Sequence, residues 1–144
     1  MDESDYKILE ILKKNARTGY SDISLEIGLS TPTIRDRIIR MEGDGIIRGY
    51  APILDYAKLG LTLTAFIGVT LNHPSCCRED VVMTLRTMSE IIEAHYTDGD
   101  EDMIVKVVCK DTSAFLKLLA RITSIEGVGK TRSVISLSTE IFHG

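Results

Sequence analysis

Arginine, hydroxyl and carboxylate side chains are concentrated between residues 30 and 48, and together they suit nucleic-acid recognition. An arginine can donate two parallel hydrogen bonds to guanine or phosphate, a carboxylate can accept from cytosine, and a threonine methyl group can contact thymine. The residue types leave open which of these side chains read bases, which bind phosphate and which are ordinary surface charge. We expect DNA contacts from Ser30, Thr31, Thr33, Arg35, Asp36, Arg37, Arg40 and Arg48.

A helix is needed to present these side chains on one face. Ile34, Ile38 and Met41 are spaced i, i+4 and i+7, which predicts an apolar stripe along a helix with the polar residues off that stripe. Ser30 or Thr31 can cap its first turn. The polar face is therefore expected to point away from the protein core.

The preceding residues complete a helix-turn-helix pattern. A shorter helix is predicted at residues 21–27, and Gly28 can take the left-handed conformation that a sharp helix exit requires. Two helices joined by a three-residue turn place the second helix in the DNA major groove. An earlier helix at residues 2–15, with Asp2 as its cap, and a wing-like hairpin at residues 46–54 are also predicted.

The remaining sequence alternates between strand and helix patterns. Its order is βαββαβ, the ferredoxin-like arrangement of one antiparallel sheet with two helices on one face. Phe66, Ile104 and Val108 point to the other face, which predicts a homodimer because an uncovered apolar face requires a partner. The predicted strands are 61–71, 91–97, 103–109 and 128–142, and the predicted helices are 78–88 and 112–122.

These patterns predict an α+β chain with two domains. A winged helix-turn-helix domain is expected at residues 1–55, a linker at 56–60 and a ferredoxin-like domain at 61–144. The formal net charge is −4, and each half of the chain is acidic by two charges, so bulk charge does not support DNA binding. The case for DNA rests on the local arginines, because phosphate contact depends on a local footprint.

Other chemical signals are weak. Residues 127–131 imitate the end of a phosphate-binding loop, but Ser124 stands where the first glycine is required. No serine, cysteine or threonine has a nearby base that would activate it as a nucleophile, so no enzyme is expected. The adjacent Cys76 and Cys77 suit neither a disulfide nor a tetrahedral metal site, and the histidines lack metal-ligand spacing. Neither a metal site nor a cofactor is therefore expected. An odd cysteine count and no signal peptide or apolar membrane span predict a cytoplasmic protein.

Taken together, the sequence resembles the Lrp/AsnC, or feast/famine, family of transcription regulators. The resemblance covers about residues 2 to 142, and the order and spacing of the matching patterns make it specific. The patterns are Asp5–Leu9, Asn15–Arg17, Ile27–Ser30, Arg37–Glu42, Gly45–Tyr50, Tyr96–Asp102 and Thr131–Ser133.

The resemblance implies that the second domain binds a small amino-acid effector between dimers and that dimers assemble further, commonly to octamers. The acidic turn at residues 98–102 can receive an ammonium group, and Arg132 can hold a carboxylate. A solvated hairpin tip is the alternative reading of this turn. The implied effector-binding residues are Thr97, Gly99, Asp100, Asp102, Thr131, Arg132 and Ser133.

Two other functions remain open at this stage. The first is an architectural DNA-binding protein without small-molecule control. Sirohaem decarboxylases resemble the same two-domain architecture, but no stretch rich in arginine and histidine marks an active site here. A thermal-shift screen against the common amino acids separates the effector-responsive regulator from the architectural protein.

Overall fold

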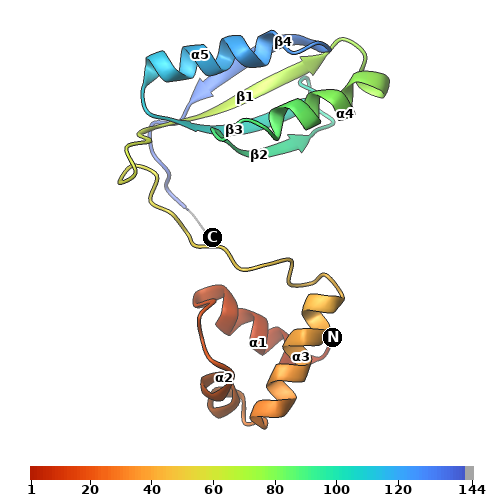
Figure 1. Cartoon of the computed structure of the whole chain (residues 1–144), viewed down its shortest axis with the longest axis vertical. Coiled ribbons are helices and arrows are strands. Elements are labelled where there is room, and N and C mark those ends of the chain that lie inside the picture. Colours follow the sequence, from red (N-terminus) through yellow and green to blue (C-terminus); the bar gives the residue numbers. More distant parts are fainter. Residues whose placement is uncertain (142–144) are drawn as a thin grey trace. The chain divides into compact units, whose positions relative to one another are not determined.

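The computed structural model describes residues 1–141, without the side chains of residues 74–76, and Figure 1 shows how the chain is arranged. The chain divides into two compact units, one at residues 1–54 and one beginning at residue 55. Each unit has its own cluster of buried hydrophobic side chains. Of the features named above, the last residue of the strand predicted at residues 128–142 and the side chain of Cys76 lie outside the described part.

The N-terminal unit consists of three helices, α1 (Glu3–Lys14), α2 (Tyr20–Ile27) and α3 (Thr31–Gly43). All three predicted helices are confirmed. Side chains from each helix meet in one core, because each helix presents its apolar stripe to the other two. The buried residues are Ile8, Leu12, Ile23, Ile34, Ile38 and Met41.

Local capping interactions set where these helices begin and end. Asp2 and Asp5 form a reciprocal capping box at the start of α1, each side chain accepting from the other's backbone N–H. Ser30 caps α3 by accepting from the backbone N–H of Thr33. Gly28 ends α2 with φ of 79°, in the left-handed region that glycine tolerates. The sequence predicted the Asp2 and Gly28 roles, and of the two predicted caps of α3, Ser30 or Thr31, the structure has Ser30.

The predicted hairpin at residues 46–54 does not form. Ile46 and Ile47 both donate their backbone N–H groups to the Met41 carbonyl, and no strand follows up to Leu54. The alternating apolar pattern lacks a pairing segment in this unit, and Pro52 removes a backbone donor. The wing of the predicted winged domain is therefore an extended segment without strand pairing.

The second unit has the predicted βαββαβ order. Its elements are β1 (Leu63–Leu71), α4 (Pro74–Leu85), β2 (Ile91–Tyr96), β3 (Met103–Cys109), α5 (Thr112–Thr123) and β4 (Val128–Ile135). The strands form one antiparallel sheet in the order β2-β3-β1-β4. This arrangement places β1 and β3, the most buried strands, at the centre.

Two elements of this unit differ from the prediction by more than two residues at one end or both. Helix α4 begins at Pro74 and ends at Leu85, about one turn earlier than the predicted residues 78–88. Strand β4 ends at Ile135, whereas the prediction continued it to residue 142. The two strands are antiparallel, and Ile135 pairs with Ala65 close to the start of β1 at Leu63. The residues that follow Ile135 therefore have almost no β1 residues left to pair with.

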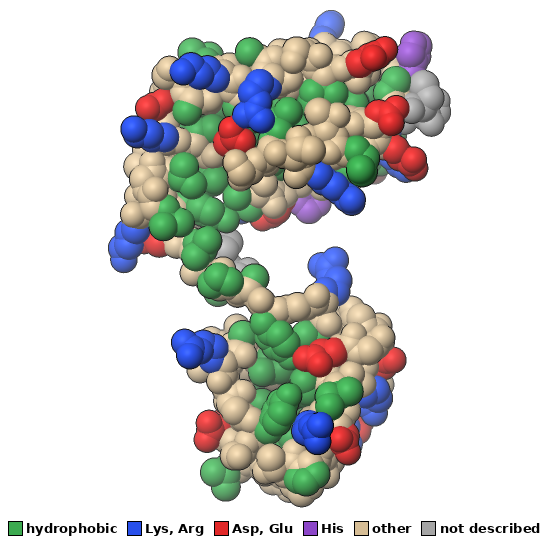
Figure 2. Space-filling view, viewed as in Figure 1, with side chains coloured by type: hydrophobic (Ala, Val, Ile, Leu, Met, Phe, Trp, Pro, Cys, Tyr) green, Lys and Arg blue, Asp and Glu red, His purple; other side chains and the backbone are tan. Residues whose placement is uncertain are grey.

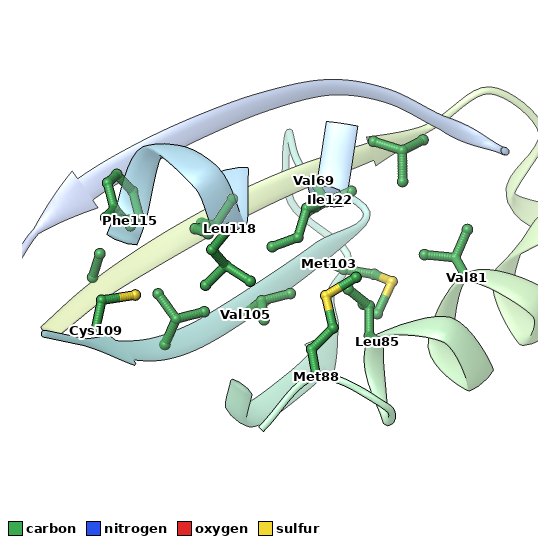
Figure 3. Close-up of a cluster of buried hydrophobic side chains, with 14 of the residues drawn as sticks. Val69, Val81, Leu85, Met88, Met103, Val105, Cys109, Phe115, Leu118 and Ile122 are labelled. Carbon is green, nitrogen blue, oxygen red and sulfur yellow. The ribbon is translucent and has the colours of Figure 1, made fainter. Parts of the chain in front are cut away.

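Helices α4 and α5 cover one face of the sheet, and the core of this unit lies between the helices and that face (Figure 3). Leu85 from α4, Leu118 and Ile122 from α5, and Val105 from β3 are nearly or fully buried there. Burying each such side chain contributes roughly 1.5–3 kcal/mol, which holds the helices on the sheet. The sheet thus offers a rigid support for side chains on its other face.

The other face of the sheet, called here the open face, is not covered by α4 or α5, which both pack on the opposite face (Figure 1). Phe66 and Ile104 remain 41% and 39% exposed, as the prediction of an uncovered apolar face requires. Val134 pairs with Phe66 in the register and is also exposed. Val108 follows the same alternation but is buried. Separately, no helix of residues 1–141 is both long and apolar enough to cross a membrane.

Candidate DNA-contacting helix and effector turn

The N-terminal half of α3 presents the polar face that the sequence predicted. Thr31, Arg35 and Asp36 are exposed, while Thr33 is half-buried and shares a 2.7 Å hydroxyl hydrogen bond with Ser30. Ile34 lies fully buried between them in sequence, so the helix is fixed with these side chains on its outer side. This half of the helix is chemically equipped to contact base edges and phosphates.

The arginines in the C-terminal half of α3 are engaged inside the unit. Arg37 Nη1 lies 2.7 Å from the carboxylates of both Asp2 and Asp5, and Arg40 Nη2 lies 2.7 Å from Asp5. The Asp5 and Asp2 carboxylates raise the pKa of Arg37 above its ordinary value. A DNA contact by Arg37 or Arg40 stays a prediction, but both guanidinium groups already have internal partners.

Arg48 and Tyr50 lie in the extended segment that follows α3. The Arg48 side chain is exposed. The Tyr50 hydroxyl donates a 2.8 Å hydrogen bond to Glu42, on the last turn of α3. Burial and this hydrogen bond raise the pKa of Tyr50 to about 12. The contact ties the extended segment to the end of α3.

Charge on the molecular surface is mixed. Figure 2 shows acidic and basic side chains interspersed on the visible face of each unit, together with exposed hydrophobic side chains. Several exposed carboxylates are neutralised by nearby lysines, as in the Glu3–Lys7 pair on α1. Any attraction for DNA therefore has to come from a few local cations.

The predicted effector turn connects β2 to β3, and two of its residues hold it closed. Thr97 donates its backbone N–H to the Asp102 carbonyl, at 2.9 Å, and its hydroxyl to the Glu101 carbonyl. The Asp102 carboxylate accepts the backbone N–H of Leu71, at 2.7 Å, beside the irregularity at the end of β1. Thr97 and Asp102 therefore maintain the turn, whereas Gly99 and Asp100 are exposed at its tip.

Glu101 crosses the open face and forms an ion pair that the sequence did not predict. Its carboxylate lies 2.7 Å from Arg132 on β4, and the intervening β1 residue is Gly68. A Cβ atom at Gly68 would lie only 2.5 Å from the Glu101 Cγ atom. Gly68 therefore leaves the space that Glu101 occupies. A glycine inside an alternating strand was the available signal, because it marks close approach by another group.

The three predicted β4 residues do not share one face. Arg132 pairs with Gly68, whereas Thr131 pairs with Val69 and Ser133 with Ile67. Val69 and Ile67 belong to the core on the helix side, so strand alternation places Thr131 and Ser133 on that side. The structure thus brings Arg132 together with Glu101 and separates it from its two hydroxyl-bearing neighbours.

The described residues contain no group of three histidine, cysteine or acidic side chains arranged to hold a metal ion. The side chain of Arg78 on α4 stacks over the Tyr96 ring, with 4.9 Å from its Cζ atom to the ring centroid. This contact joins α4 to the end of β2, just before the predicted effector turn. It was not anticipated, because the two residues are far apart in sequence.

Two family models match most of the chain, one in each unit. The AsnC-type helix-turn-helix domain matches residues 1–42, and the Lrp/AsnC ligand binding domain matches residues 64–143. Regulatory protein AsnC of Haemophilus influenzae is 34% identical over 142 residues, covering 98% of this chain and 94% of that protein.

Solved structures agree along the whole chain. The structure of Escherichia coli AsnC has a TM-score of 0.91 and 31% identity, covering 100% of this chain and 97% of that one. The transcriptional regulator NMB0573 of Neisseria meningitidis, solved as a complex with L-Met, has a TM-score of 0.93 and 28% identity. That match covers 99% of this chain and 94% of the other.

Proposed function

The chain belongs to the Lrp/AsnC family of transcription regulators, and we propose that it binds double-stranded DNA through α3 under the control of a free amino acid. The observation that carries this proposal is the polar N-terminal half of α3, which a buried apolar stripe holds outward in a helix-turn-helix unit. This is the part of such a helix that reaches base edges.

The proposed DNA contacts are revised from the sequence prediction. Arg35 is the best candidate to read guanine, and Asp36 can accept a hydrogen bond from cytosine. Arg37 and Arg40 are left out because Asp5 and Asp2 already bind them. The proposed contacting residues are Ser30, Thr31, Thr33, Arg35, Asp36 and Arg48.

Self-association through the open face of the sheet is part of the proposal. Phe66, Ile104 and Val134 form an exposed apolar group there, and pairing two such faces removes them from water. A two-fold dimer presents two α3 helices, which suits half-sites about one duplex turn apart. We propose further that dimers assemble into larger particles, up to octamers.

An amino-acid effector is proposed to bind at the turn between β2 and β3. Asp100 and Gly99 at the exposed tip can receive an ammonium group, and Arg132 can hold a carboxylate. The complex of a related regulator with L-Met supports an amino acid as the ligand class. Arg132 is already paired with Glu101, so the ligand carboxylate must share or displace that partner.

Control of DNA binding is then a coupling between two sites. An effector that binds one assembly state more tightly shifts the population toward that state and changes DNA affinity. The coupling must be reciprocal, so DNA changes effector affinity by the same factor. Regulators named among the relatives support a non-enzymatic role, and we place the protein in the cytoplasm, where its DNA is.

A thermal-shift screen against the common amino acids, followed by DNA titration, tests the proposal. One amino acid, or a small group of related ones, should raise the melting temperature and change the affinity for DNA fragments selected from a random pool. Stabilisation by no amino acid would leave an architectural DNA-binding protein. Failure to bind any duplex at low salt, in any assembly state, would overturn the whole proposal.

A further inference from the structure

Asp5 is the only charged side chain of the described residues that is buried, with 1% of its surface exposed. It lies in the first turn of α1, far in sequence from α3. A buried carboxylate is costly unless it is paired and fully hydrogen-bonded. Its partners therefore indicate what it does.

Both oxygens of the Asp5 carboxylate are used. Oδ1 accepts from Arg37 Nη1 at 2.7 Å, and Oδ2 accepts from Arg40 Nη2 at 2.7 Å and from the backbone N–H of Asp2 at 2.9 Å. Asp2 gives Arg37 a second carboxylate at 2.7 Å. The carboxylates of Asp5 in α1 and of Asp2 at its cap thus face two guanidinium groups on α3.

This arrangement has two consequences for a helix that binds DNA. The four charges cancel, so the C-terminal half of α3 offers little net positive charge to phosphate. The Arg37 side chain is only 22% exposed and its Nε atom is buried without a hydrogen-bond partner, so its position is set by the carboxylates. The rotation of α3 against α1 is fixed by the same contacts.

We propose that Asp5 is a positioning residue that withholds Arg37 and Arg40 from DNA phosphates and so raises the preference for specific over non-specific DNA. The proposal rests on the DNA-binding function proposed above. Cations free to contact any phosphate strengthen binding to all sequences equally. Because Arg37 and Arg40 are held inward, the N-terminal half of α3 alone distinguishes specific from non-specific DNA.

Asp5→Asn tests the proposal, because it keeps the shape of the side chain and removes the charge. Binding to a random-sequence duplex is measured over a series of salt concentrations, since each phosphate contact adds about 0.9 to the slope of log affinity against log salt. The slope should steepen by about one to two. Affinity for random DNA should rise more than affinity for a duplex selected by the wild-type protein.

Glu3→Gln is the matched control. It removes one negative charge from the same turn of α1, but Glu3 pairs only with the exposed Lys7 and touches neither arginine. Its salt slope should equal that of the wild type. A slope that steepens equally in both variants would attribute the effect to net charge and overturn the proposal. An unchanged slope in a folded Asp5→Asn variant would overturn it as well.

Arg40→Gln keeps the proposal testable if Asp5→Asn does not fold. Asp5 then retains Arg37, and the salt slope should stay at the wild-type value because Arg40 does not contact phosphate in the wild type. A slope smaller by about 0.9 would show that Arg40 binds phosphate and would overturn the inference while leaving DNA binding intact. Absence of DNA binding by the wild type would instead overturn the proposed function.

Discussion

The Glu101–Arg132 ion pair makes a specific prediction about effector affinity. If Arg132 holds the carboxylate of the amino acid, its present partner Glu101 competes with that ligand. Glu101→Gln preserves the size of the side chain and removes its charge. The ligand should therefore bind more tightly to Glu101→Gln than to the wild-type protein.

The magnitude follows from the exposure of the pair. The Arg132 side chain is 75% exposed and that of Glu101 is 19% exposed, so water screens much of their attraction. Such surface pairs are worth about 0.2–1 kcal/mol. Removing the competitor should then lower the effector Kd by about 1.5- to 5-fold, and thermal stability should change little.

Gly68→Ala provides an independent route to the same state. The added Cβ would lie 2.5 Å from the Glu101 Cγ atom, about 0.9 Å short of the ordinary 3.4 Å contact. The Glu101 Cβ atom, at 3.3 Å, is also tight, so the Glu101 side chain must shift away from β1. Arg132 loses its partner by steric displacement, with the Glu101 charge retained.

The assay is isothermal titration with the amino acid that stabilises the wild-type protein most. Glu93→Gln serves as the control, because Glu93 lies on the same sheet and pairs with Lys106, not with Arg132. Both test variants should bind the effector more tightly, and the control should match the wild type. An effector Kd equal to or weaker than the wild-type value in either test variant would refute the competition between Glu101 and ligand.

Three further outcomes follow from contacts elsewhere. Asp102→Ala should destabilise the second unit by about 1–3 kcal/mol, seen in chemical denaturation, because the Leu71 backbone N–H loses its acceptor. Burial works to raise the pKa of Asp5, but hydrogen bonds from the Asp2 backbone and from Arg37 outweigh it and lower this pKa below its usual range. The ionised carboxylate therefore adds stability above the unfolded pKa, and that stability is lost as pH falls through the folded pKa. The melting temperature of the wild type should therefore fall as the pH is lowered through this pKa. Asp5→Asn should lack this part of the decrease when melting temperatures are measured over a series of pH values. The pKa of Tyr50 is about 12, so Tyr50→Phe should remove a late step from the phenolate absorbance titration.

Most of the fold could be predicted because it depends on local patterns. The i, i+4, i+7 stripe of Ile34, Ile38 and Met41 lies fully buried, and Gly28 takes the left-handed conformation expected of it. Strand alternation and helical apolar stripes together predicted the order of all six elements in the second unit. These features need only the neighbours in sequence, so sequence reasoning reaches them.

Two of the errors occur where an element depends on a partner strand. The alternating residues 46–54 look like a hairpin, but no paired strands form there. Strand β4 stops at Ile135 because β1, its neighbour, begins at Leu63. Alternation predicts the ability to pair, whereas the length of the neighbouring strand decides how many residues do so.

The same distinction explains why the candidate sites needed revision. The sequence pattern of a helix face does not distinguish a polar residue that points to DNA from one that bonds to another helix. Arg35 and Arg37 differ by two positions, yet only Arg37 reaches the buried Asp5. The carboxylate that decides between them lies 32 residues away in the chain, in the cap of another helix. Leaving the buried Asp5 carboxylate unpaired would cost more free energy than one exposed phosphate contact contributes. A cation can therefore be assigned to DNA only once the internal acids that it must neutralise are known.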